Sequence, residues 1–441
     1  MIKVCKFGGT SMADAKAMLQ VKAIIEADKT RKYVVVSAPG KRFKTDIKIT
    51  DTLYKCYREI EEKGNCTESF SIIRDRFIEI VKDLKLDLDI VSILDNTEKE
   101  MVENKSADYC ASRGEYLSAV IMANLLGVEF VDSKDLIRFD SKGRLNQEYT
   151  DDKVKSRLEN VECAVVPGFY GKDSSGKIKT FSRGGSDITG SIIARGVKAD
   201  LYENWTDVSG FLVCDPRIVE GAKVIKQLTY KELRELSYMG ASVLHAEAIF
   251  PVMKGKIPIN IKNTFKPEDA GTMIVPSEQY TLTGSDSIIT GIAGKKDFTV
   301  IFIEKSMMNS EIGFIRKVLS VVEHHGIGVE HVPSGIDTLS IVLESEQLKD
   351  GVLNDLVSEI RENVNPDYIH VIENVSLIAT VGHGMTRRSG TAAKIFTALA
   401  EQGVNIKMID QGSSELNIII GVSNSDYEKC IHTIYKAFIK D

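Results

Sequence analysis

Residues 6–11, with the sequence KFGGTS, join a lysine to two successive glycines where an apolar segment gives way to a helical one. A Gly-Gly turn that opens a helix leaves backbone N–H groups free to meet an anion. Lys6 adds a formal positive charge, so Lys6, Gly8 and Gly9 are candidates for binding a phosphate or carboxylate. For a lone Gly-Gly pair, however, a plain strand-to-helix turn is the better explanation, so other segments must decide.

Two further segments place charged residues beside glycine. In SRGE, residues 112–115, an arginine and an acid lie close together in a helical region, although such pairs usually form a solvated surface. In SRGGSD, residues 182–187, the glycines allow close backbone approach and Arg183 offers a fork for a carboxylate or phosphate. Asp187 could begin a helix or hold a cation. A second glycine turn with a capping aspartate explains SRGGSD equally well.

A polar segment, WTDVSG followed by DPR, comes directly after a predicted strand. Thr206 and Asp207 offer oxygen atoms to an adenine or a metal, and Arg217 could neutralise phosphates. A polar loop with a structural tryptophan is the plain alternative. Neither the P-loop pattern GxxxxGK[ST] nor the dinucleotide pattern GxGxxG occurs, which disfavours hydride transfer. The seven cysteines never form CxxC and the seven histidines are dispersed, so neither a structural zinc site nor a disulfide framework is expected.

The elements that must position these residues indicate an α/β domain. Uninterrupted β-branched runs are typical of strands covered on both faces, and they predict a mainly parallel sheet between helices. The predicted strands are residues 2–5, 33–37, 128–131, 164–166 and 201–202. The first helix is predicted over residues 11–27, and residues 51–127 are interpreted as two or three helices on one side of the sheet.

Near residues 264–287 the composition changes to turn-forming residues, and an internal repeat follows. The shift that aligns Gly326 with Gly403 also aligns Leu339 with Leu416, without a gap. Each unit is predicted as strand, helix, strand, strand, helix, with a left-handed glycine after its first helix, which indicates two ferredoxin-like βαββαβ domains. Residues 287–293 are predicted to cross over and complete the second sheet. The expected parts are a domain over 1–275, a linker with the crossover strand over 276–297, and the ferredoxin-like domains over 298–373 and 374–441.

The composition is that of a globular chain. Its 441 residues include 57 Lys and Arg against 63 Asp and Glu, a net charge of −6, and no basic block favours nucleic-acid binding. The N-terminus lacks the pattern of a signal peptide, and no apolar run approaches the roughly 18 residues of a membrane span. We therefore expect a soluble, cytoplasmic protein that binds neither nucleic acid nor membrane.

Taken in order, KFGGTS, SRGE, SRGGSD and WTDV resemble the amino-acid kinase family, and within it the aspartokinases, whose kinase domain is also followed by two tandem ACT domains. The resemblance covers essentially the whole chain. It implies a three-layer αβα kinase domain with a mainly parallel sheet, followed by two ACT domains. It also implies phosphorylation of L-aspartate to 4-phospho-L-aspartate by ATP with Mg²⁺, the first step of lysine, threonine and methionine biosynthesis.

The same resemblance assigns roles to the matching residues. Lys6 would touch the transferring phosphoryl group beside Gly8 and Gly9. Asp187 and Asp207 are candidates for ordering Lys6 or Mg²⁺. No side chain is assigned as a metal ligand. The residues implied to bind aspartate are Thr50, Glu115, Arg183 and Ser186. Those implied to contact the nucleotide are Lys6, Thr206, Asp207, Leu212, Arg217 and Ser242.

Two features depart from the family pattern. Ser242 stands where many relatives have lysine, so one nucleotide contact is missing or replaced. The loop over residues 41–51 is longer than usual, and we assign the substrate-binding threonine to Thr50 rather than Thr45. The basic residues of this loop are Lys41, Arg42, Lys44 and Lys48. The loop is therefore either a mobile lid over the phosphates or a solvated basic loop.

The ACT domains imply a homodimer, or a tetramer, with an amino-acid effector at their shared edge. By resemblance the effector is lysine, with threonine as a second candidate. The residues implied to bind it are Met308, Ser310, Gly328, Val329, Glu330 and Ser334. Glu330 is the only acid among them and would pair with the effector ammonium, unless it is simply an acid on a surface strand.

Two other functions remain open: a kinase of the same family acting on glutamate, and an amino-acid sensor without catalysis. The presence of Lys6, Glu115, Arg183 and Asp187 speaks against a sensor, because a catalytically dead domain would be free to lose them.

Overall fold

The structure, a computed structural model, describes the chain except for residues 183, 242–243, 245, 282–287 and 440–441. The chain forms two compact units. The first comprises Met1–Phe211, Val224–Leu233 and Ser242–Thr281. The second comprises Leu212–Lys223, Arg234–Ala241 and Leu282–Asp441. Two short segments of the first 275 residues thus pack with the C-terminal part of the chain.

The first unit is built on an eight-stranded sheet with the order β3-β4-β2-β1-β7-β9-β10-β8. Neighbouring strands are parallel except for β9 and β10. Its strands are β1 (Lys3–Phe7), β2 (Arg31–Val36), β3 (Glu129–Phe130), β4 (Ala164–Pro167), β7 (Leu201–Thr206), β8 (Gln227–Thr229), β9 (Ile259–Asn263) and β10 (Thr272–Val275). A two-stranded hairpin, β5 (Tyr170–Lys172) with β6 (Ile178–Thr180), lies beside it. The predicted mainly parallel sheet is confirmed.

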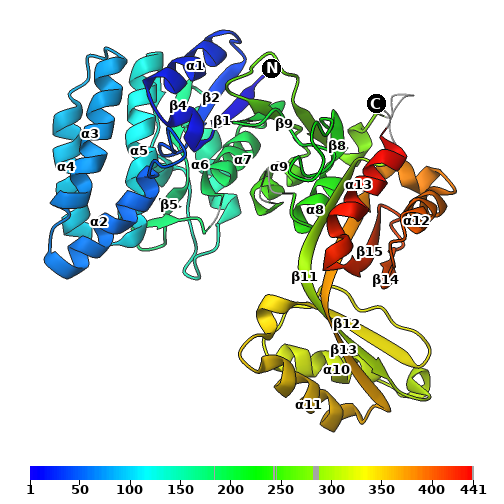
Figure 1. Cartoon of the computed structure of the whole chain (residues 1–441). Coiled ribbons are helices and arrows are strands. Elements are labelled where there is room, and N and C mark those ends of the chain that lie inside the picture. The colour runs from blue at the N-terminus through cyan, green and yellow to red at the C-terminus, as the bar shows by residue number, and fades with distance from the viewer. Residues whose placement is uncertain (183, 242–243, 245, 282–287, 440–441) are drawn as a thin grey trace. The chain divides into compact units, whose positions relative to one another are not determined.

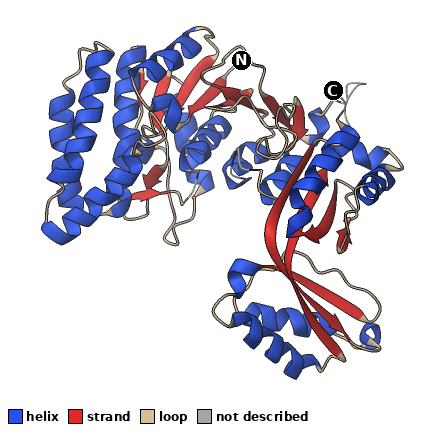
Figure 2. Ribbon diagram, viewed as in Figure 1, coloured by secondary structure: helices blue, strands red, loops and turns tan. Residues whose placement is uncertain are grey.

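Helices cover both faces of this sheet (Figure 2). Cys5 and Phe7 of β1 pack into a core with α1 (Ala15–Glu26) and with the helical layer formed by α2 to α5. That layer consists of α2 (Ile49–Lys63), α3 (Thr67–Asp83), α4 (Ile90–Asn104) and α5 (Ala107–Leu126). On the other face α7 (Gly185–Gly196) packs on β1, β2 and β7, beside α6 (Gln147–Leu158) and α9 (Phe250–Lys254).

Two details of this helical layer correct the sequence prediction. Residues 51–127 form four helices rather than two or three, because Gly64 and Lys105 take left-handed conformations that end α2 and α4. The helix expected over residues 11–27 is divided, because Asp14 caps the N-terminus of α1 after the short turn η1 (Gly9–Met12).

The second unit contains a five-stranded sheet with the order β12-β11-β13-β15-β14 (Figure 1). Its strands are β11 (Gly291–Glu304), β12 (Thr338–Glu344), β13 (Tyr368–Val381), β14 (Met408–Asp410) and β15 (Asn417–Ser423). Its helices are α10 (Phe314–His324), α11 (Val352–Val364), α12 (Thr391–Glu401) and α13 (Tyr427–Phe438). The end of α8 (Tyr230–Tyr238) also belongs to this unit. The ferredoxin-like pair expected from the repeat is confirmed.

The two ferredoxin-like halves share the long strands β11 and β13. Residues 298–304 of β11 pair with β12 in one half, whereas residues 291–295 pair with residues 377–381 of β13 in the other. Residue 287 of the expected crossover segment lies outside the described residues, and the strand begins at Gly291. In the first repeat unit, the element order strand, helix, strand, strand, helix places its second strand at residues 328–332. These residues form only an isolated bridge, at His331. No helix among the described residues is long and apolar enough to cross a membrane.

Candidate active site

A cavity of about 340 Å³ lies in the first unit where β1 and β2 end and α7 begins. This is the edge at which parallel sheets usually bind ligands. Its lining brings together five residues singled out in the sequence, which are Lys6, Thr50, Glu115, Ser186 and Asp187. The remaining lining residues are Ser37, Tyr54, Phe169, Ser182, Gly184 and Gly185.

An ion pair between Lys6 and Asp187 lies at this cavity. Lys6 Nζ is 2.6 Å from Asp187 Oδ1, and only 7% of Lys6 is exposed. Asn204 Nδ2 donates a hydrogen bond to the same carboxylate oxygen at 2.8 Å. Parallel pairing of β1 with β7 places Lys6 opposite Asn204, so the sheet register itself brings the ammonium and the amide to Asp187. The lysine side chain is therefore held in place before any ligand binds.

The N-terminus of α7 forms another wall of the cavity. Gly184 precedes the helix with φ of 57°, a left-handed conformation that favours glycine. A side chain at Gly185 would collide with Phe169, since an added Cβ would lie 2.4 Å from its ring. Free N–H groups and the helix dipole make such an N-terminus favourable for an anion. The two glycines of SRGGSD thus allow the helix to begin inside the site.

Glu115 is a buried carboxyl group in the wall formed by α5. It is 5% exposed, and its Oε2 has no hydrogen-bond partner among the residues that the structure describes. Burial raises the pKa of Glu115 to about 8, although a hydrogen bond from the Ala38 backbone acts in the opposite direction. Gly114 lets α5 approach the chain after β2, because an added Cβ would lie 2.6 Å from that of Ala38. A buried carboxyl group at a cavity wall, with one oxygen free of contacts to the described residues, is suited to a cationic ligand.

The glycine turn after β1 differs in one respect from the sequence prediction. The Gly8 N–H was expected to face an anion, but it donates to the Trp205 carbonyl oxygen at 3.0 Å and is not available. This bond extends the ladder between β1 and β7. Gly9 is needed for close packing, since an added Cβ would lie 3.1 Å from the Ala38 carbonyl oxygen.

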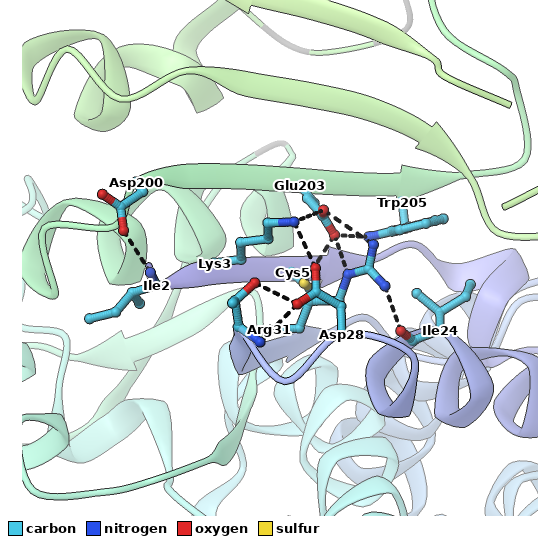
Figure 3. A network of polar contacts seen from close by, with 10 residues as sticks. Ile2, Lys3, Cys5, Ile24, Asp28, Arg31, Asp200, Glu203 and Trp205 are labelled. Atoms are coloured by element: carbon cyan, nitrogen blue, oxygen red, sulfur yellow. Dashed lines mark hydrogen bonds and ion pairs between the residues drawn. The ribbon is translucent and has the colours of Figure 1, made fainter. Parts of the chain in front are cut away.

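A buried polar network fixes β1, β2 and β7 from the opposite face of the sheet (Figure 3). Glu203, 2% exposed, accepts hydrogen bonds from Arg31 Nε at 2.8 Å and from Trp205 Nε1 at 3.0 Å. Lys3 Nζ lies 3.6 Å from its carboxylate, and Cys5 Sγ donates to it at 3.4 Å. Successive side chains along a strand point to opposite faces of the sheet. The Glu203 network and the group formed by Lys6, Asp187 and Asn204 therefore hold neighbouring residues of β1 and β7 from opposite faces.

The residues expected to contact a nucleotide are distributed over both units. Thr206 ends β7 and Asp207 follows it, with the Thr206 hydroxyl donating to the Asp207 carboxylate at 3.3 Å. Leu212 and Arg217 belong to the second unit, where Arg217 pairs with Asp215 at 2.6 Å. Arg183 and Ser242, expected to bind substrate and nucleotide, lie outside the described residues.

The structure also separates the two threonines weighed for the substrate site. Thr50, in the first turn of α2, lines the cavity, whereas Thr45 is exposed in the preceding loop. Two other site residues, Asn204 and Tyr54, were not singled out in the sequence. A polar Asn204 within a buried strand was a usable signal, since buried polar groups need partners. Nothing in the sequence distinguished Tyr54 from the other residues of an amphipathic helix.

The residues implied to bind an effector lie in the first ferredoxin-like half. Met308 is buried in its core, while Ser310, Gly328 and Ser334 are exposed. Glu330 is half-buried, and its backbone N–H donates to the Val342 carbonyl oxygen of β12, in the manner of a residue in an edge strand. Val329 packs against the same core. Met308 and Ser310 precede α10, whereas Gly328, Val329, Glu330 and Ser334 follow it.

Comparisons with known proteins agree with this architecture. A sequence model of the amino acid kinase family matches residues 1–263, and one of an ACT domain matches residues 378–438. Aspartokinase 3 of Bacillus subtilis is 38% identical over 99% of this chain and 98% of its own length. The crystal structure of Clostridium acetobutylicum aspartate kinase, described as an allosteric enzyme, is 53% identical with a TM-score of 0.94, and the match covers 99% of this chain and 100% of that one.

Escherichia coli aspartokinase III, solved with aspartate and ADP, shares the fold at 24% identity and a TM-score of 0.75, with 99% of each chain covered. The αβα layers, the cavity at the strand ends and these matches together define the class of protein. The chain belongs to the amino acid kinase family and, within it, to the aspartokinases. It is accordingly a kinase.

Proposed function

We propose that this chain transfers the γ-phosphoryl group of ATP to the β-carboxylate of L-aspartate, forming 4-phospho-L-aspartate and ADP. The observation that carries the proposal is one cavity that combines a lysine–aspartate pair, a helix N-terminus and a buried glutamate. The 53% identity over the full length of an enzyme named aspartate kinase supports the same substrate. The product would enter lysine, threonine and methionine biosynthesis.

The proposed chemistry suits the groups in this cavity. A carboxylate is already deprotonated at neutral pH, so the attack needs no general base. One carboxylate oxygen forms a bond to phosphorus while the bond to the leaving oxygen of ADP breaks, and the demand is for positioning and positive charge. Lys6 supplies charge to the transferring group, and the N-terminus of α7 adds its dipole. Asp187, held by Asn204, keeps the lysine in place.

Substrate binding in this proposal uses opposite charges for the two charged groups on the α-carbon of the amino acid. Glu115 takes the ammonium, and Arg183 takes the α-carboxylate through its guanidinium fork. Thr50 and Ser186 add hydroxyl groups from two different walls. A glutamate molecule held by Glu115 and Arg183 would carry its reacting carboxylate farther from these two residues, because its side chain is one methylene longer. The distance from these residues to the phosphoryl group would therefore set the specificity for aspartate.

ATP would bind through Lys6, Thr206, Asp207, Leu212, Arg217 and Ser242. Mg²⁺ would be held mainly by the nucleotide phosphates and by water, as is usual for kinases. The residues present fit such a role, since Asp187 lines the cavity beside Lys6 and its side chain is 18% exposed. No cluster of three potential metal-ligating side chains occurs in the described part of the chain. Bound Mg²⁺ would neutralise phosphate charge.

Regulation is proposed to act through the ACT domains, with lysine, or threonine, binding near Glu330. Three large apolar side chains beside the implied effector residues are exposed: Met307 by 70%, Ile312 by 97% and Ile336 by 71%. Their turns are adjacent, because the Asn309 N–H donates to the Ile336 carbonyl oxygen at 3.1 Å. Exposed apolar side chains gathered in one place are typical of a protein interface. We therefore propose a homodimer, or a tetramer, assembled through this surface.

The test is ADP release with Mg-ATP and L-aspartate, with hydroxylamine present to trap the acyl phosphate. Hydroxamate from aspartate but not from glutamate, suppressed by lysine, is the expected result. Hydroxamate from glutamate instead would move the protein to another branch of the family. No hydroxamate with either amino acid, together with lysine binding by calorimetry, would favour an amino-acid sensor.

A further inference from the structure

Arg76, on α3, is a buried arginine outside the cavity that contacts two segments leading into it. One guanidinium nitrogen, Nη1, donates to the Ala13 carbonyl oxygen at 2.9 Å, and the other, Nη2, donates to Asp46 Oδ2 at 2.6 Å. Only 6% of Arg76 is exposed. Ala13 follows the turn that starts at Gly9, and Asp46 lies in the loop before α2. One planar group therefore joins the glycine turn to this loop.

Asp46 is also the internal anchor of its own loop. The Arg42 N–H and Nε both donate to Asp46 Oδ2, at 2.9 and 3.0 Å, and the Asp46 N–H donates to Phe43. Arg42 in turn reaches Glu79 on α3 at 3.0 Å. Burial alone would raise the pKa of Asp46, but hydrogen bonds from Arg42 and Arg76 outweigh it and hold this pKa below its ordinary value. The carboxylate is thus charged and fully used at neutral pH.

Both ends of the same loop are held by backbone hydrogen bonds. At its start, the Gly40 N–H donates to the Gly9 carbonyl oxygen at 2.8 Å. At its end, the Ile49 N–H donates to Pro39 at 3.2 Å, and the next residue is Thr50 in the cavity wall. Arg76 fastens the middle of the loop. The Arg42–Glu79 ion pair is the other side-chain contact between this loop and α3, and it lies at the surface, where the Glu79 side chain is 58% exposed. The buried Arg76 contact is therefore the less solvated of the two.

We propose that Arg76 is a positioning residue for phosphoryl transfer, which sets the separation between the glycine turn and the loop that leads to Thr50. The proposal rests on the function proposed above. A guanidinium can hold two acceptors in one plane, whereas a lysine ammonium lacks this fixed fork. Small displacements of positioned groups have large effects on rate, of the order of 10²-fold for about 1 Å. The loop does not line the cavity itself, and in this proposal it acts by holding the start of α2, where Thr50 lies in the cavity wall.

The experiment compares Arg76→Gln, Arg76→Lys and Asp46→Asn with the matched control Arg74→Gln. Arg74 lies on the same helix and pairs with Asp95 and Glu98 on α4, at 2.7 and 2.9 Å, so its loss weakens the helical layer without touching the loop. Two quantities are measured on the full-length protein: kcat and KM for aspartate and ATP, and amide hydrogen exchange of peptides covering residues 9–14 and 40–49. Thermal unfolding shows how much each variant is destabilised.

We expect Arg76→Gln to lower kcat/KM at least tenfold and to speed exchange in both peptides, while Arg74→Gln does neither. Arg76→Lys should behave like Arg76→Gln, because charge alone does not restore the fork. The double variant with Asp46→Asn should lose no more activity than the worse single variant. Activity of Arg76→Gln within twofold of the Arg74 control, or faster exchange confined to α3, would overturn the proposal. Should Arg76→Gln fail to fold, the same kinetic and exchange measurements on the Asp46→Asn variant decide between these outcomes.

The two proposals fail in distinguishable ways. If the wild-type protein forms no hydroxamate from aspartate, the proposed function is wrong. The exchange measurement needs no substrate, so unchanged exchange at residues 9–14 and 40–49 in Arg76→Gln would refute the joining role of Arg76 independently.

Discussion

Replacing Glu115 by glutamine is expected to stabilise the ligand-free protein while it lowers the rate of phosphoryl transfer. The reason is that Glu115 is buried with one oxygen that no described residue contacts by a hydrogen bond, and its pKa is raised from 4.5 to about 8. Around pH 7 the native state therefore keeps a proton that the unfolded chain has already released. Native protein thus binds more protons than unfolded protein, and stability falls as pH rises between these two pKa values.

The size of this effect follows from the two pKa values. Each pH unit between about 5 and 8 reduces the free energy of unfolding by up to about 1.4 kcal/mol through this one group. From pH 5 to pH 7 the loss is roughly 3 kcal/mol, a large part of the stability of an ordinary domain. Glutamine cannot ionise, so the Glu115→Gln variant lacks this slope. Other titrating groups are shared, and they cancel in the difference between variant and wild type.

The assay is urea unfolding at pH 5, 6, 7 and 8, followed by tryptophan fluorescence. The sequence has a single tryptophan, Trp205, which is buried in the first unit and reports on the unfolding of that unit. A matched control is Glu103→Gln on the neighbouring helix α4, where the side chain is 61% exposed. The difference between Glu115→Gln and wild type should grow with pH, and the control difference should stay constant.

The affinity for aspartate should change with pH in the direction opposite to the change in stability. An ammonium ligand needs the charged form of Glu115, so binding of aspartate should release a proton, and affinity should rise with pH toward 8. Loss of this charged contact should lower kcat/KM roughly 10²-fold. A pH-independent stability difference would show that the carboxyl group is already ionised in the native state. Wild-type kcat/KM in the variant would exclude Glu115 from binding the ammonium.

Three further results are expected. Lys6→Ala should lower turnover at least 10³-fold while circular dichroism and effector binding persist, because the Asn204–Asp187 contact remains; near-normal hydroxamate formation would exclude Lys6 from the site. Glu330→Ala should relieve inhibition by lysine with little change in the uninhibited rate, and an unchanged inhibition curve would place the effector elsewhere. Ile312→Asp should convert a dimer into monomers by light scattering, without loss of thermal stability, because this side chain is 97% exposed; a persistent dimer would contradict assembly through this surface.

Much of the fold follows from local patterns. Apolar β-branched runs predicted the central strands, because residues covered on both faces need no polar alternation. The repeat predicted two ferredoxin-like halves, and Gly326 and Gly403 both take the left-handed conformation expected after their helices, with φ of 68° and 65°. Element ends were less predictable. The division of residues 51–127 into four helices depended on Lys105 taking a left-handed conformation, which lysine rarely does.

The sequence predicted which segments form the candidate site, but it did not predict the contacts between their side chains. Lys6 and Asp187 each stood in a glycine-rich motif, and resemblance to the family linked them. Their 2.6 Å contact and the part of Asn204 in it depend on β1 lying beside β7. Strands far apart in sequence pair according to which faces they bury, and no local pattern specifies that choice. The unavailable Gly8 N–H has the same origin, because Trp205 becomes its acceptor only through this pairing.

The sequence by itself determined which residues could do chemistry, because the residue type fixes which functional group a side chain carries, an ammonium for lysine or a carboxyl group for an acid. It also determined the order of motifs and the repeat that identify the family. Only the tertiary structure decided which faces of β1 carry Lys6 and Cys5, and that one oxygen of the buried Glu115 carboxyl has no partner among the described residues. It also decided that Arg76 joins the glycine turn to the loop before Thr50. The physical reason is that burial and charge pairing depend on neighbours in space, and the fold brings those neighbours from distant parts of the chain.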